Sequence, residues 1–220
     1  MAWTLDTIAD GMLPLSRFQK TTGTMEAIGV WHSLFYAAGR PAAAAAPSPG
    51  LGGAALTTYA GQLPWVDPAG GSESRLAKLA ANCSLAGTLL LCDRLWHNSG
   101  LTVTTTTAQT CDSVAWPARD KDGAITGEDV LIGIEVRTAT TNAGAVSNMT
   151  ISYDDTGGNA ATGTTAYNFP ATAAAGTFVP FNLASGDTGM KQLNSVTLGT
   201  SLGAGAVHMV AYRVLDQVEV

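Results

Sequence analysis

The sequence predicts an all-β fold, an antiparallel jelly-roll-like (Greek-key) sandwich that carries an extended, mostly irregular N-terminal arm. From Val130 onward, short runs of alternating apolar and polar residues are separated by turns of Gly, Asn, Asp, Ser and Thr. The runs begin about every dozen to twenty residues, with no helical pattern between them, which favours antiparallel strands over alternating β and α units.

Side-chain alternation defines the individual strands. In the first, Ile132 and Ile134 alternate with Gly133 and Glu135, so one face of the strand is expected to be buried. The other strands expected in this region, in chain order, are 149–153, 165–169, 179–183, 192–200 and 206–215.

Three of these segments carry further information. The composition of 154–159 favours a tight reversal after the second strand. Pro180 has no N–H to donate to a ladder, which predicts an edge position for its strand. The run 206–215 is apolar on both faces and suits an interior strand covered on each side.

Two upstream segments, 74–85 and 87–96, are assigned to the same domain, which gives an arm at 1–70 and a sandwich at 71–220. Both segments are interpreted as strands. A short helical face is the alternative for the first of them, because Leu76, Leu79 and Cys83 also fit helical spacing.

The composition narrows the class of partner. Only 13% of the 220 residues are charged, the formal net charge is −6, and the 11 basic residues are scattered, which argues against nucleic acid. No apolar run approaches the ~20 residues of a membrane-spanning helix, so a soluble protein without a membrane partner is expected. Cys83, Cys92 and Cys111 lack metal-site spacing and are interpreted as buried free thiols, with a Cys83–Cys92 bridge as the alternative.

Residues 1–70 differ from the rest of the chain, because aromatic side chains are scattered among Gly, Pro and Ala without a steady period. The stretch from Pro41 to Gly53 is interpreted as a linker or as an irregular segment that lies along the surface of the domain. Aromatic residues in such an arm can anchor on its own domain or at a subunit interface. The candidate interface anchors are Trp3, Phe18, Trp31 and Phe35.

The acidic stretch 120–129 imitates a calcium loop, but the match fails at its ends. With Gly123 at the sixth loop position, Ala118 occupies the first position, which needs a carboxylate, and Asp129 replaces the expected Glu at the twelfth. A polar loop between strands explains the stretch better, so no metal or cofactor is expected.

The residues that could perform catalysis are dispersed. His32, His97 and His208 lie far apart in sequence, and His208 is expected to be a hydrogen-bonded core or interface residue. Asp93, Arg94, His97 and Ser99 form the one local cluster, which a strand-end salt bridge explains better than a triad. No catalytic residue is therefore assigned.

A carbohydrate-binding or hydrolytic sandwich is a further alternative. Tyr153, Tyr167 and Tyr212 are its candidate sugar platforms, although packing in the core would explain them equally well.

The run GTLLLCDRLWHNSGL at 87–101, followed by a Thr-rich segment at 102–107, resembles structural proteins of tailed bacteriophages. The segments 31–34, 169–172, 176–181 and 195–200 share the resemblance, which spans roughly residues 30 to 215. It implies a non-enzymatic β-sandwich with an assembly arm, present in many copies on a virion assembled in the host cytoplasm.

Within that class, the expected function is that of a capsid decoration (cement) protein. Its partners would be copies of itself, as a homo-oligomer, and the major capsid protein, bound through many small contacts and strand addition. A tail, collar or baseplate component is the alternative, and copy number per particle separates the two.

Overall fold

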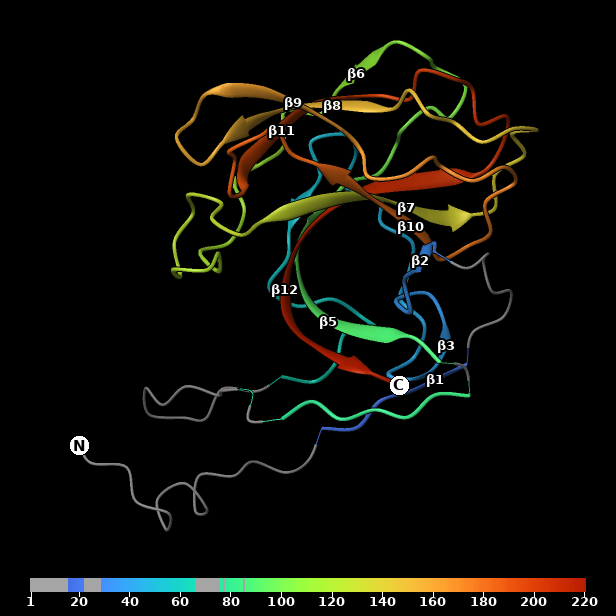
Figure 1. Cartoon of the computed structure of the whole chain (residues 1–220), viewed down its shortest axis with the longest axis vertical. Coiled ribbons are helices and arrows are strands. Elements are labelled where there is room, and N and C mark those ends of the chain that lie inside the picture. Colours follow the sequence, from blue (N-terminus) through green and yellow to red (C-terminus); the bar gives the residue numbers. More distant parts are fainter. Residues whose placement is uncertain (1–15, 22–28, 66–75, 77, 85) are drawn as a thin grey trace.

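The computed structural model of the chain describes residues 16–21, 29–65, 76, 78–84 and 86–220 (Figure 1). These residues form strands and no helix. The strands are β1 (Gln19–Thr21), β2 (Trp31–His32), β3 (Ala38–Arg40), β4 (Ala54–Ala55), β5 (Thr88–His97), β6 (Ala108–Thr110), β7 (Leu131–Thr138), β8 (Thr150–Asp155), β9 (Ala160–Thr165), β10 (Thr177–Asn182), β11 (Met190–Thr197) and β12 (Ala206–Glu219).

The strands pair antiparallel in one long sheet of order β4-β5-β12-β7-β10-β9-β8-β11-β6, with β2 also on β10 and a separate β1–β3 pair. The sheet folds over at β10, so that β9, β8, β11 and β6 lie above β7 and β12 (Figure 1). This confirms the all-β antiparallel sandwich that the alternation predicts.

The core lies between the two layers. Ile132, Ile134 and Val136 of β7 are fully buried there, facing side chains of β8 and β11. The opposite face of β7, which carries Gly133, Glu135 and Arg137, turns away from this core, as the period-two pattern requires.

The prediction that Pro180 marks an edge strand is wrong. The first half of β10 pairs with β7, through Val179↔Ile134 and Pro180↔Gly133, and its last two residues pair with β9. The strand thus passes from one layer to the other, as corner strands of sandwiches do. The ladder bond that proline cannot donate falls where β10 changes partner.

Other boundaries also differ from the expectations. Residues 160–165, instead of 165–169, form the strand after the 154–159 reversal, because the tight turn brings them directly against β8. The described part of 74–85 holds neither strand nor helix. The prediction at 87–96 is confirmed by β5. The interior position of the last strand is also confirmed, but only up to Tyr212.

Residues 29–65, called the strap below, lie against the outer face of the sheet. β5 and β12 bend into an arc, and β2 and β3 lie on its open side (Figure 1). The strap is fastened by main-chain pairing at both ends, β2 on β10 and β4 on β5. The Trp96 indole N–H donates a further hydrogen bond to Gly52 O at 3.0 Å.

Candidate functional site

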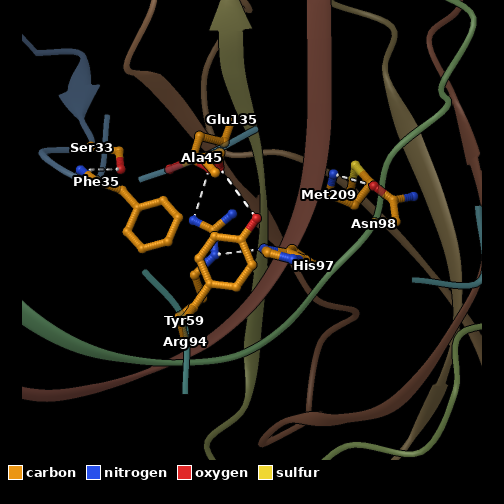
Figure 2. A network of polar contacts seen from close by, with 9 residues as sticks. All are labelled: Ser33, Phe35, Ala45, Tyr59, Arg94, His97, Asn98, Glu135 and Met209. Atoms are coloured by element: carbon orange, nitrogen blue, oxygen red, sulfur yellow. Dashed lines mark hydrogen bonds and ion pairs between the residues drawn. The ribbon is translucent and has the colours of Figure 1, made fainter. Parts of the chain in front are cut away.

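A cluster of charged and polar side chains lies on the outer face of β5, β7 and β12, beneath the strap (Figure 2). Arg94 Nη1 is 2.8 Å from Glu135 Oε2, and Glu135 is fully buried. Arg94 Nε donates to His97 Nδ1 at 3.3 Å, which requires an unprotonated acceptor nitrogen. His208 of β12 pairs in register with Glu135, which places both side chains on the same face.

Aromatic side chains of the strap cover this cluster. The guanidinium carbon of Arg94 lies 4.2 Å from the Phe35 ring centre, and that of Arg137 lies 4.9 Å from the Tyr36 ring centre. The Tyr59 ring meets the edge of His97 at 4.8 Å between ring centres. Each cation–π contact contributes about 0.5–2 kcal/mol, depending on its desolvation. The strap is thus held in part by ring faces that cover the partly buried guanidinium groups of Arg94 and Arg137.

Burial determines the protonation states within the cluster. Burial, together with the positive charge of Arg94 and the proximity of His208, lowers the pKa of His97 to about 3. Burial lowers the pKa of His208 to about 4, although the Glu135 carboxylate opposes this shift. Burial and the Glu135 charge raise the pKa of Tyr36. At neutral pH, both histidines and the tyrosine are therefore uncharged.

The local cluster expected at 93–99 is divided between several environments. Asp93 faces away from Arg94 and accepts hydrogen bonds from Arg119 at 2.9 and 3.1 Å. Ser99 Oγ accepts a hydrogen bond from Gly50 N at 2.8 Å, so it belongs to the strap attachment. The partner that sequence reasoning missed is Glu135, although its alternation with Ile134 had placed it on the outer face.

His208 is buried, as expected. Its ring nitrogens make no hydrogen bond of good geometry to another described residue, although the Asn98 main chain lies close enough to favour the protonated ring. It contributes an uncharged, polarisable ring to the cluster, with its charged form suppressed by burial.

Two of the predicted interface anchors, Trp31 and Phe35, contact the chain's own body. Trp31 stacks on Phe178 with ring centres 6.3 Å apart and remains 40% exposed. Phe35 covers Arg94, and Phe18 is half-buried next to β1. Trp3 lies outside the described residues. Trp31 therefore retains exposed ring surface beside the sheet.

The loop 120–129 lies between β6 and β7, as predicted, and is organised by Asp120. The Asp120 carboxylate accepts hydrogen bonds from the N–H groups of Asp122, Ala124 and Gly127 and from the Thr126 hydroxyl. Burial alone would raise the pKa of Asp120, but these donors outweigh it and lower the pKa below its usual value. The described residues contain no group of three or more metal-ligating side chains.

The remaining candidates have structural explanations. Tyr153 is fully buried and its hydroxyl donates to Asp187 Oδ2, while the Tyr167 hydroxyl donates to the Phe178 carbonyl. Tyr212 is also buried, so packing accounts for these three tyrosines. All three cysteines are free, but only Cys111 is buried, which corrects the expectation for Cys83 and Cys92.

A two-stranded ribbon extends beyond the rest of the sheet. The last β12–β7 pair is Tyr212↔Leu131, whereas β12 continues against β5 to Glu219↔Thr88. On the other side of β5, β4 pairs only with Trp96 and His97. Within the described part of the chain, the outer edges of residues 88–93 and 213–219 therefore have no strand partner.

No helix long and apolar enough to cross a membrane occurs in the described residues. Comparison with known protein families, with curated proteins and with solved structures found no match.

Proposed function

We propose that this chain is a non-enzymatic structural subunit of a tailed-bacteriophage particle, most specifically a capsid decoration protein, which joins its neighbours by strand pairing. The proposal combines the resemblance of residues 87–101 to phage structural proteins with the shape of the ribbon. The observation that carries it is the ribbon with its unpaired edges.

An unpaired edge presents a row of main-chain N–H and C=O groups to any extended segment. On the ribbon, these edges carry apolar side chains, with Val214 and Leu215 37% and 39% exposed and Leu89 to Leu91 half-buried. Strand addition supplies affinity through main-chain hydrogen bonds, and lattice valency multiplies weak contacts. A strand from a neighbouring subunit is the partner that this edge fits.

The strap supports the same role. It already shows the chain fastening an irregular segment onto strands through short β pairs and aromatic anchors. The exposed part of Trp31 offers a further anchor for a neighbour.

The test is the number of copies of this chain per particle. Phage particles are purified from a culture infected with the phage whose genome encodes the chain, and the copies are counted by quantitative mass spectrometry. A decoration protein is expected in hundreds of copies, and a tail, collar or baseplate component in tens or fewer. Absence of the chain from purified particles would overturn the proposal.

Ribbon variants test the route of assembly. Lysine on an edge strand opposes pairing, so Val214→Lys combined with Leu215→Lys should reduce incorporation into particles. Ser185→Lys, in the exposed turn between β10 and β11, is the matched control and should incorporate normally. Equal incorporation of both variants would exclude the ribbon as the contact.

A further inference from the structure

A pocket of about 340 Å³ lies between the strap and the body of the sandwich. The strap contributes His32, Ser33 and Tyr36 to its lining, and the body contributes Arg137 and Gly176. Thr21 of β1 and four alanines are the other described residues of the lining, so the pocket combines a few polar groups with small apolar surfaces. Its volume is at the lower end of the range for small-molecule sites.

Arg137 carries a charge that no described carboxylate neutralises. The nearest acid on the same face of β7, Glu135, is already paired with Arg94 at 2.8 Å. Arg137 takes part in none of the ion pairs found among the described residues, and its Nε is buried without a hydrogen-bond partner. Its guanidinium carbon lies 4.9 Å from the centre of the Tyr36 ring.

The charges of the described cluster residues therefore do not balance. Arg94 and Arg137 contribute two positive charges, Glu135 contributes one negative charge, and His97 and His208 are neutral at pH 7. Among these five side chains one positive charge remains, in a chain whose formal net charge is −6. A half-buried cation of this kind is stabilised by an anion that enters the pocket.

We propose that this pocket binds a single carboxylate group on a short hydrocarbon body, with Arg137 as its principal ligand. The planar fork of an arginine side chain matches a carboxylate with two parallel hydrogen bonds. The Ser33 hydroxyl lines the pocket and supplies a further donor, while its oxygen accepts from Phe35 N at 3.2 Å. One fixed cation and alanine walls suit a monoanion with methylene groups better than a multiply charged phosphate.

Binding would also stabilise the docked strap. The pocket walls come from both the strap and the body, and the two meet at the Ser33 N–H, which donates to Gly176 O at 2.7 Å. A carboxylate held by Arg137 and Ser33 would bridge the two parts. Slower amide exchange in residues 31–38 on ligand addition is therefore expected.

The carboxylate can belong to a free organic acid or to an acidic residue of a peptide, so two probes are needed. Butyrate represents the free acid, and N-acetyl-glutamate N-methylamide represents the peptide-borne group. Each probe is titrated into the intact, ¹⁵N-labelled chain, and the amide chemical shifts are recorded by NMR at each step. Tighter binding of one probe identifies the source.

Saturable shifts in residues 32–38 and 174–176 are expected for the wild-type chain. Arg137→Gln should weaken binding about tenfold or more, because a charge-assisted pair of hydrogen bonds is lost. Arg137→Lys keeps the charge but loses the fork, so it should bind with intermediate affinity. Lys191→Gln removes an equal charge at a separate surface pocket and should leave binding unchanged.

The wild-type titration decides the proposal even if an Arg137 variant does not fold. Absence of saturable shifts at the pocket with both probes would overturn the carboxylate site. Shifts of equal size in Arg137→Gln and the wild type would also overturn it. This site does not depend on the assembly role, and neither outcome bears on the copy number in particles.

Discussion

Mild acid should destabilise the protein through His97 and His208. Both are buried and neutral in the folded chain, with pKa values lowered to about 3 and about 4 from an ordinary value of 6.5. In the unfolded chain, both take up a proton as the pH falls below 6.5. The unfolded state then binds more protons, so stability is fully present above pH 6.5 and is lost as the pH falls toward the folded-state values.

The magnitude follows from the width of that window. When the pH falls from about 7.5 to about 5, protonation of each histidine in the unfolded chain should lower the unfolding free energy by about 2 kcal/mol. The two histidines together should lower it by about 4 kcal/mol. This is a large fraction of the ~5–15 kcal/mol that stabilises a typical domain. Most carboxylates titrate below this range, so the window isolates the histidines.

Several charged and aromatic groups face the two rings. Arg94 of β5 donates to His97, Tyr59 of the strap covers the same ring, and Glu135 of β7 lies beside His208. The Glu135 carboxylate and the Asn98 main chain favour protonation of His208, and the positive charges of Arg94 and Arg137 oppose it.

The assay is urea unfolding at intervals across this pH range for the wild type, His97→Asn, His208→Asn and the double variant. The slope of unfolding free energy against pH is the readout, because each substitution also changes absolute stability. Each single variant should lose about half of the wild-type slope, and the double variant most of it. A wild-type unfolding free energy that is flat over the range, or single variants with the full slope, would refute the reasoning.

Two further predictions concern a loop and the strap. Asp120→Asn should lower the unfolding free energy by about 1–3 kcal/mol, because the neutral amide cannot replace a carboxylate that accepts several hydrogen bonds. The exposed Asp122→Asn should change it by less than about 0.5 kcal/mol, and equal losses in chemical denaturation would contradict this role. Gly176→Ala should speed amide exchange in the strap, because a Cβ there would lie 2.4 Å from His32 Cε1. Gly186→Ala has a similar positive φ, 99° against 98°, with open space around it, so an equal effect would implicate backbone strain instead of the His32 contact.

Local patterns of the sequence predicted the sandwich strands well. Alternation around Ile132 and Ile134 identified β7 and its two faces, because a half-buried strand must alternate. The next hairpin was less visible, since β9 consists of small residues such as Ala161 and Gly163, whose pairing with β8 depends on the turn. The role of Pro180 depends on which strands neighbour it in space, which no local pattern contains.

The candidate site was only partly predictable, for a related reason. The sequence showed His97 beside Arg94 and placed Glu135 on an outer strand face, but the ion pair joins residues 41 positions apart across β12. The contacts of the strap were harder still to predict from the sequence, because Phe35 and Tyr59 lie in segments without a strand-like or helical hydrophobic period. Such contacts follow from the path of the chain in space.

The corner strand β10 has a consequence for how the molecule unfolds. Because its first half belongs to one layer and its last two residues to the other, neither layer can separate without breaking the same strand. The two layers should therefore open as one cooperative unit, with similar hydrogen-exchange protection for amides on both. Exposure of the core then requires global unfolding, because no single layer offers a lower-energy route to it.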